Sequence, residues 1–225
     1  MDFEFLCRVP LFRGCSYQQI QEIYQCFQGV CRTFSKGETI FHAGQKVSSL
    51  GIVLSGSVTI ESIDVWGNRT ILDHIEAGNV FAETYACLPH QPMLVNAVAA
   101  QNCEILLLPV EKLLHPCKQN CGAHGVLIGN LLAISSQKNL HLSRRMFHTR
   151  SKLLRDRVIS YLSFQSIQQN SLAFSIPFNR QQLADYLGVD RSALSNELSK
   201  MQKEGLITVQ KNNFVLHPSL VEGNS

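Results

Sequence analysis

The first apolar pattern of the chain is helical. Ile20, Ile23, Tyr24 and Phe27 follow one another at steps of three, one and three residues, which places them on one face of a helix. Ser16 stands directly before this stretch and has the side chain of a good N-cap. The pattern therefore predicts a short amphipathic helix near the N-terminus.

A different pattern follows over residues 34–110. Short apolar runs are separated by glycines, and this spacing is typical of an antiparallel all-β domain. Residues 57–61 alternate polar and apolar side chains as a half-buried strand does. A Trp-Gly-Asn turn at residues 66–68 would join two such strands. We expect a small β-barrel or jelly roll.

Helical periodicity returns beyond the barrel, and residues 122–147 predict one long helix. Leu127, Leu131 and Ile134 step by four and three residues, which gives a seam for packing one helix on another. Two interpretations are open at this stage. The helix either lies on its own barrel or pairs with the same helix of a second copy of the chain.

A second helix is expected over residues 151–166, where apolar residues again gather on one face. The 225 residues of the chain exceed the usual size of one domain, about 100–150 residues. We therefore predict two domains. Residues 1–148 form the barrel together with the long helix, at about residues 116–148, and residues 149–225 form a second domain.

Residues 179–198 are the most informative stretch of the second domain. They predict a helix, a tight turn at Gly188 and a second helix capped by Asp190. Two short helices that meet at a glycine turn form a helix-turn-helix. The residues expected to point inward are Leu183, Ala184, Leu187, Leu194, Leu198 and Met201.

The opposite face of the second helix carries short or donor-bearing side chains. These are Arg191, Ser192, Ser195, Asn196 and Ser199. Arginine can bind the guanine edge and asparagine the adenine edge in the DNA major groove, whereas an ordinary solvated helix face is usually richer in Glu and Lys. The pattern favours a DNA-reading helix.

The segment after this helix completes a winged helix-turn-helix. Two strands are expected at residues 205–209 and 214–216, joined by an Asn-Asn turn at residues 212–213 that can take positive φ. Lys211 at the tip of this wing would contact phosphate. Arg180 and Gln181, which begin the first helix, complete the predicted DNA-binding set.

The distribution of charge supports a polyanionic partner. Residues 1–149 hold 11 Lys and Arg against 11 Asp and Glu, whereas residues 150–225 hold 9 against 6. The whole net charge of +3 therefore lies in the second domain. The acidic start and the lack of an apolar run of about 18 residues indicate a cytoplasmic protein that binds no membrane.

At this point the chain resembles the Crp/Fnr family, that of the cyclic-AMP receptor protein and the fumarate-nitrate reductase regulator. The resemblance covers nearly the whole length. Its motifs, besides the helix-turn-helix, are Pro-Leu-Phe at residues 10–12, Lys-Gly-Glu at residues 36–38 with Gly44, Leu-Ser-Gly-Ser-Val at residues 54–58 and Glu-Ala-Gly-Asn-Val-Phe-Ala-Glu at residues 76–83.

The resemblance implies an α+β fold with a cyclic-nucleotide-binding-type β-barrel (jelly roll), a long dimerisation helix and a C-terminal winged helix-turn-helix. It also implies a homodimer that regulates transcription from a palindromic site on double-stranded DNA, with Arg191 as the main guanine contact. The residues at Ser192 and Asn196 are often Glu and Arg in relatives, so the operator should differ. RNA polymerase is an expected partner, although no residue pattern identifies the contact surface.

The cyclic-nucleotide site of the family is altered. Nucleotide-binding relatives place a Gly-Glu pair on the ribose and an Arg followed by Ser or Thr on the phosphate; here Ala82-Glu83 and Met93-Leu94 stand there. Two apolar residues cannot pair a buried phosphate, so we do not expect cyclic AMP. A pocket near Phe81, Ala82, Glu83, Met93 and Leu94, closed by Leu131 and Ser135, would hold a small organic or amphipathic effector. The alternative is a barrel filled by its own side chains.

Redox or gas sensing is the alternative within the family. Cys7, Cys15, Cys26 and Cys31 lie where relatives hold an iron–sulfur cluster, but their gaps do not match a cluster motif, and reduced thiols are the default. A thiol switch, a haem ligated by His74, or a metal on Cys117, Cys121 and His124 are further alternatives. We expect no bound metal or cofactor.

Two other classes of protein fit the sequence less well. A regulatory module that does not bind DNA would share the barrel, but the Ser-rich helix face and the wing argue against it. An enzyme is not expected, because the chain shows no metal-spaced His and acid set in its strands, no nucleophile elbow and no phosphate loop. The sequence therefore predicts a DNA-binding regulator with no catalytic residues.

Overall fold

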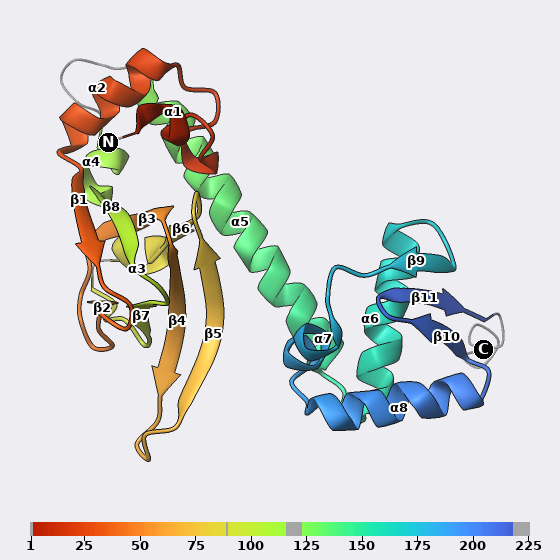
Figure 1. The fold of residues 1–225 in the computed structure, drawn as a ribbon. Coiled ribbons are helices and arrows are strands. Elements are labelled where there is room, and N and C mark those ends of the chain that lie inside the picture. The colour runs from red at the N-terminus through yellow and green to blue at the C-terminus, as the bar shows by residue number, and fades with distance from the viewer. Residues whose placement is uncertain (1, 89, 116–122, 218–225) are drawn as a thin grey trace. The chain divides into compact units, whose positions relative to one another are not determined.

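The computed structural model describes residues 2–88, 90–115 and 123–217 of the chain. The chain divides into two compact units, Met1–Gln137 and Lys138–Ser225 (Figure 1). This division falls inside the long helix α5, Ala123–Thr149, because the last turns of that helix bond to the C-terminal unit. The domain boundary at residue 148 stays a prediction.

The N-terminal unit begins with short helices that cover one end of the barrel. They are α1 (Phe3–Leu6), the 3₁₀ helix η1 (Pro10–Phe12) and α2 (Tyr17–Phe27). The predicted N-cap of α2 is confirmed, since Ser16 accepts a hydrogen bond from the backbone of Gln19, whose side chain bonds back to Ser16. Both bonds satisfy amides that the helix itself cannot.

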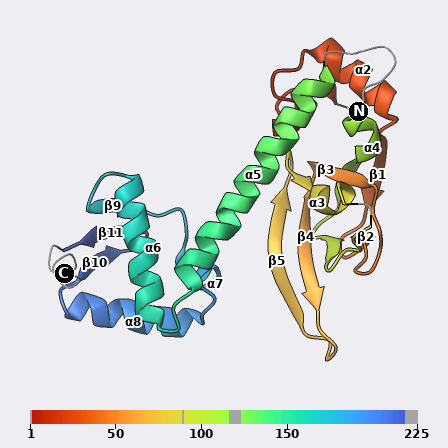
Figure 2. The same cartoon turned by 180° about the vertical axis from the view of Figure 1, so that it is seen from behind.

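The barrel consists of two four-stranded antiparallel sheets, in the strand orders β1-β8-β3-β6 and β2-β7-β4-β5 (Figures 1 and 2). The expected jelly roll is thus confirmed. Its strands are β1 (Val30–Phe34), β2 (Thr39–Phe41), β3 (Ser49–Ser55), β4 (Ser57–Ile63), β5 (Arg69–Glu76), β6 (Val80–Phe81), β7 (Asn96–Ala99) and β8 (Cys103–Pro109). Helix α3 (Glu83–Ala86) follows β6, and α4 (Val110–Leu114) follows β8.

Strand β4 is more buried than its alternating sequence indicates. Ser57, Thr59 and Glu61 are at most 6% exposed, because β4 lies between β7 and β5 in its sheet. The polar atoms find partners there: the Thr59 hydroxyl donates to a carbonyl of β7, and Glu61 forms an ion pair with Arg69 of β5. The expectation of a half-exposed strand was therefore wrong.

Helix α5 packs on the barrel unit through one stripe. Leu127 and Leu131 are at most 5% exposed in the core of their own unit, and Ile134 packs against that core. Asn130, on the same side, donates to the carbonyls of Leu11 and Arg13 at 2.9 and 2.8 Å. Of the two interpretations of this stripe, the structure shows the one in which the helix lies on its own barrel.

In its described part, the C-terminal unit holds the helices α6, α7 and α8 and a small sheet (Figure 2). Its elements are α6 (Leu154–Gln168), β9 (Ala173–Ser175), α7 (Arg180–Leu187), α8 (Arg191–Lys203), β10 (Ile207–Gln210) and β11 (Asn213–Leu216). Strand β9 pairs with β11 and extends the predicted hairpin to three strands. All six residues predicted to point inward from α7 and α8 are at most 2% exposed.

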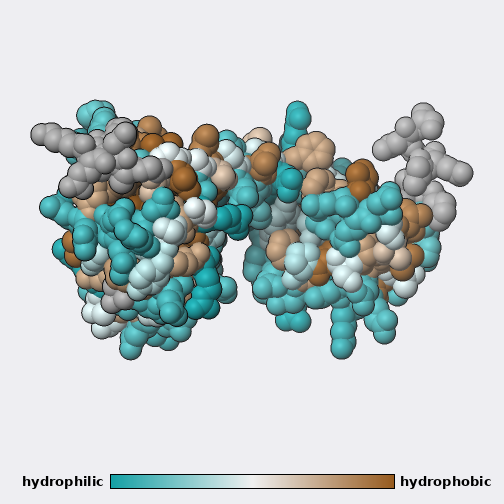
Figure 3. All heavy atoms as spheres, turned by 90° about the horizontal axis from the view of Figure 1, so that it is seen from above, coloured by the Kyte–Doolittle hydropathy of each residue, from teal (hydrophilic) through white to brown (hydrophobic). Residues whose placement is uncertain are grey.

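The surface of both units is mainly hydrophilic in the view of Figure 3, with hydrophobic residues at scattered places. Among the described residues, no helix combines the length and hydrophobicity that a membrane crossing requires.

Candidate nucleic-acid interface

Three residues stand at the ends of α7 and α8, and Gly188 forms the turn between them. Asn179 caps α7 by accepting a hydrogen bond from Gln182, whose side chain bonds back to Asn179. Gly188 ends α7 with a φ of 67°, a conformation that favours glycine. Asp190 occupies the N-cap position of α8, but its side chain forms no cap hydrogen bond. The prediction of a glycine turn is confirmed, and that of a capping Asp190 side chain is wrong.

The five residues predicted to read DNA gather on one face of α8. Arg191, Ser192, Asn196 and Ser199 are exposed, and Ser195 is half-buried. The Ser199 hydroxyl donates to the Ser195 carbonyl at 2.8 Å, so it is left as an acceptor. The exposed face thus offers one guanidinium, one carboxamide and small hydroxyls.

A second arginine adds positive charge beside this face. The pKa of Arg180 lies below its usual value, because burial disfavours the charged guanidinium and because Arg191 adds like charge nearby. An anion between the two arginines would relieve that repulsion, as a DNA phosphate does. Gln181 is exposed, and its amide donates to Asp185 at 2.8 Å.

The wing has a tighter turn than expected. Gln210 pairs with Asn213, so the turn consists of Lys211 and Asn212, and Lys211 takes the positive φ of 55°. The expectation of an Asn212-Asn213 turn was wrong, because Asn213 begins β11 and its side chain bonds to Ser175 of β9 at 2.6 Å. Lys211 itself is exposed at the tip, as expected.

Two arginines that the sequence did not single out bind the C-terminal end of α7. Arg145 of α5 donates to the carbonyls of Asp185 and Tyr186 at 2.9 and 3.1 Å. Arg157 of α6 donates to the carbonyl of Leu187 at 3.0 Å. Carbonyls of a helix's last turn are left without full intrahelical bonding, and cations are stabilising there.

Tyr186 of α7 is the centre of an aromatic cluster. From α5, His141 and His148 have ring centroids 6.1 and 6.2 Å from the Tyr186 ring, and Tyr161 of α6 lies 5.3 Å away. His148 is 1% exposed and bonds to Ser160 at 2.9 Å. Its pKa is lowered by burial and by the charge of Arg144. The last turns of α5 thus form part of the C-terminal core.

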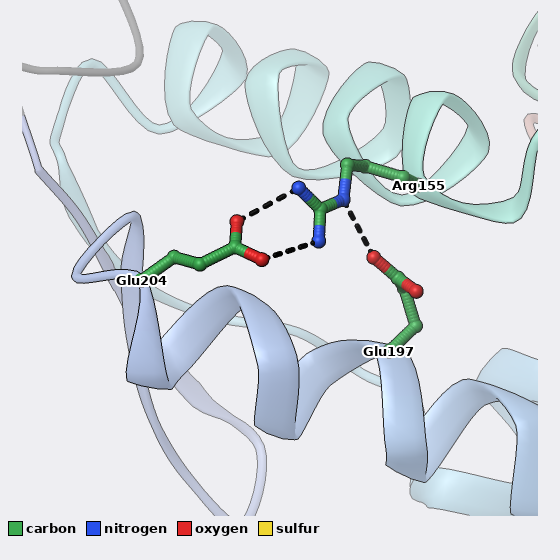
Figure 4. Close-up of polar contacts among 3 residues, drawn as sticks. All are labelled: Arg155, Glu197 and Glu204. Carbon is green, nitrogen blue, oxygen red and sulfur yellow. Dashed lines mark hydrogen bonds and ion pairs between the residues drawn. The ribbon is translucent and has the colours of Figure 1, made fainter.

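Arg155 of α6 binds two glutamates at α8, Glu197 and Glu204 (Figure 4). Its guanidinium donates to Glu197 at 2.6 Å and to both carboxylate oxygens of Glu204 at 2.7 and 2.8 Å. Sequence reasoning missed these contacts, because the partners are 42 and 49 residues apart and no periodicity links them. The pKa of Glu204 is lowered, chiefly by its hydrogen bonds from Arg155.

The structure brings only part of the predicted effector pocket together: Phe81, Ala82 and Met93 share one core cluster. Phe81 and Met93 are at most 2% exposed in the barrel core, with Ala82 packed beside them, and Phe81 lies so close to Gly51 that a Cβ there would fall 2.3 Å from its ring. Leu131 belongs to the other core cluster of this unit.

The remaining three pocket residues differ in exposure. Leu94 is 70% exposed and Glu83 is buried, while Ser135 is half-buried. This packing favours the alternative of a barrel interior that its own side chains fill.

The candidate redox residues belong to the N-terminal unit. Cys7 is exposed, and Cys15, Cys26 and Cys31 are half-buried; burial raises the pKa of Cys15 and Cys31, which disfavours the thiolate. His74 is exposed on β5. Cys117 and Cys121 lie outside the described residues, whereas His124 is buried against Phe27. Within the described ranges, no three His, Cys, Asp or Glu side chains are grouped as a metal site.

Comparison with known proteins matches two parts of the chain. Residues 31–120 match the cyclic nucleotide-binding domain family, and residues 156–219 match the Crp-like helix-turn-helix domain family. The chain is 24% identical over 210 residues to the cyclic AMP receptor protein of Thermus thermophilus, covering 88% of each protein.

Solved structures show a similar fold. CprK complexed with OCPA matches with a TM-score of 0.62 and 15% identity, over 87% of this chain and 91% of that one. The c-di-GMP responsive global regulator CLP of Xanthomonas campestris matches with a TM-score of 0.57 and 19% identity, over 90% and 99%.

A barrel of the cyclic nucleotide-binding type, a long helix and a winged helix-turn-helix in one chain define a DNA-binding transcription regulator with an effector-binding type of domain. The chain belongs to the Crp/Fnr family, which consists of regulators and not of enzymes.

Proposed function

We propose that the chain acts as a homodimer that reads a palindromic operator through α8. The observation that carries this proposal is the exposed face of α8, where Arg191 and Asn196 stand among small hydroxyls. Arg191 would bind a guanine edge and Asn196 an adenine edge. Arg180 and Lys211 would bind phosphates on either side, which fixes the register of the reading helix.

The dimer is supported by a second stripe along α5. Ile128, Leu132, Leu142 and Met146 are 37%, 66%, 63% and 70% exposed, and with the polar pair Ser135 and Asn139 they follow steps of four and three residues. This is the spacing of a two-stranded coiled coil. Two-fold pairing would present two reading helices to half-sites about one helical turn, roughly 34–36 Å, apart.

The test begins with selection of binding duplexes from a randomised pool by the full-length protein. Enrichment of a palindrome supports the proposal, and failure to enrich any sequence refutes it. Arg191→Ala should then lose discrimination between the selected and a scrambled duplex, while it keeps salt-dependent nonspecific binding. Lys152→Ala is the control, because Lys152 is an exposed cation outside α7 and α8.

We further propose that the barrel does not bind a cyclic nucleotide in the manner of its relatives. Met93 and Leu94 stand at the phosphate position and offer no side-chain donor, and Met93 is only 2% exposed. Titration calorimetry should therefore show no heat of binding for cyclic AMP or cyclic GMP. Saturable binding of either one would refute this part.

The effector would then be a small organic molecule or the redox state of the thiols. An ultraviolet-visible spectrum of anaerobically purified protein distinguishes an organic effector or a thiol switch from a haem or an iron–sulfur cluster, because only the last two absorb visible light. A regulator of this kind would act in the cytoplasm, where it meets DNA and RNA polymerase.

A further inference from the structure

Arg155 holds α8 at two separate points. Its Nε donates to Glu197, while Nη1 and Nη2 bind the two oxygens of Glu204 (Figure 4). Paired bonds of this fork-to-fork kind restrict both distance and orientation. Glu197 and Glu204 are seven residues apart, which is about 10 Å along a helix at 1.5 Å per residue. One guanidinium therefore fixes two places along the axis of α8.

The two carboxylates lie on the side of α8 that faces away from the reading residues. At 100° per residue, Glu197 and Glu204 point within about 20° of each other. The mean direction of Arg191, Ser192, Ser195, Asn196 and Ser199 is about half a turn away. A rotation of α8 that broke the contacts of Arg155 would therefore turn the reading face by the same angle.

Apolar packing fixes which side of α8 is buried, since Leu194, Leu198 and Met201 are at most 2% exposed. The Arg155 contacts add a directional restraint on the rotation of the helix. The Glu197 side chain is 15% exposed, that of Arg155 36% and that of Glu204 46%.

From this geometry we propose that Arg155 is a positioning residue for DNA reading. It sets the rotation of α8 about its own axis through Glu197 and Glu204, and thereby the aim of Arg191 and Asn196 at base edges. Arg155 itself touches no base. The inference rests on the proposed function, and it assigns part of the sequence discrimination to a residue on α6, outside the helix-turn-helix.

The test compares full-length Arg155→Met with the wild-type protein. The probes are a duplex selected from a randomised pool by the wild-type protein and a scrambled duplex of the same composition. We expect the ratio of specific to nonspecific affinity to fall about 10- to 100-fold, the value of one or two base contacts. Nonspecific affinity should change less than about threefold, since the phosphate contacts remain.

Two controls separate positioning from charge and from stability. Lys152→Met removes the same charge from an exposed side chain three residues earlier and should leave the ratio unchanged. Thermal melting verifies that each variant is folded at the assay temperature, since a purely stabilising role would lower the melting temperature without changing the ratio. Arg155→Lys should give an intermediate ratio, because an ammonium cannot form the paired bonds to Glu204.

A double-mutant cycle checks the route of the effect. If Arg155 acts through Glu204, then Arg155→Met combined with Glu204→Gln should discriminate no worse than Arg155→Met alone. An unchanged ratio in folded Arg155→Met would overturn the inference, as would an equal loss in Lys152→Met. A wild-type protein that selects no sequence would instead refute the proposed function itself, which the selection step reveals before any variant is made.

Discussion

Replacing Leu142 by aspartate should separate the two subunits. Leu142 is 63% exposed in the single chain and lies in the middle of the stripe that we assign to subunit pairing. Full burial of a leucine side chain contributes about 1.5–3 kcal/mol, so burying the exposed part contributes about 1–2 kcal/mol. In a two-fold symmetric dimer the substitution removes this contribution from both subunits. The total loss of about 2–4 kcal/mol raises the dimer dissociation constant roughly 30- to 1000-fold.

Sedimentation equilibrium over a range of protein concentrations measures this constant directly. Leu140→Asp is the matched control, because Leu140 is 55% exposed in the same helix but lies outside the stripe. The control should remain dimeric, and it should bind the full palindrome with wild-type affinity. Leu142→Asp should bind a full palindrome no more tightly than a single half-site.

Other outcomes would contradict the assignment of this stripe to subunit pairing. If Leu142→Asp stays dimeric while Leu140→Asp dissociates, the subunits pair along another line of α5. If neither variant dissociates, α5 is not the dimer helix. If the dimer dissociation constant rises by the same factor in both variants, helix stability and not pairing has been changed.

Three further outcomes are expected from the C-terminal unit. Arg145→Met removes two charged hydrogen bonds, each worth about 1.5 kcal/mol or more, so the melting temperature of this unit should fall by roughly 10–20 °C; an unchanged melting curve would contradict the role of Arg145. His148 is held neutral with a pKa below its usual 6.5, so the unfolded chain binds its proton first and stability should fall as the pH drops below about 6.5. Urea unfolding at pH 5–8 should show this loss in the wild type and less of it in His148→Gln. Lys211→Ala should weaken specific and nonspecific binding alike and lower the salt slope by about 0.9, whereas a loss confined to the selected duplex would place Lys211 at a base.

The sequence predicts those features that depend on local periodicity. Steps of three and four residues identify the buried face of α8, and its complement is the face that we propose reads DNA. The same rule identifies the stripe of Leu127 and Leu131 but cannot say which surface covers it. That choice depends on the space between α5 and the barrel, which only the folded unit defines.

Local patterns in the sequence do not predict contacts between residues that are far apart in the chain. The bonds of Arg155 to Glu197 and Glu204 join helices that are separated by the whole of α7 and the sheet strand β9. The Asn179 cap was within reach, because Asn followed three residues later by Gln is a capping-box spacing. The effector pocket stays a prediction, because a motif position gives the residue but not whether its side chain points into the core, as that of Met93 does.

The caps on α7 determine which segment of the chain must be transferred to obtain a stable DNA-binding domain. Helix α7 has eight residues, fewer than the roughly 12–15 at which isolated helices become marginally stable, so it depends on its packing and on the bonds at its ends, which include those from the cations at its C-terminal end. One of these, Arg145, is contributed by the same helix that packs on the barrel. A helix-turn-helix transplanted from residue 149 onward would leave that cap behind. The smallest segment that keeps this cap is the winged helix-turn-helix together with the last turns of α5. A chimaera that exchanges DNA-binding domains between relatives should therefore include those turns.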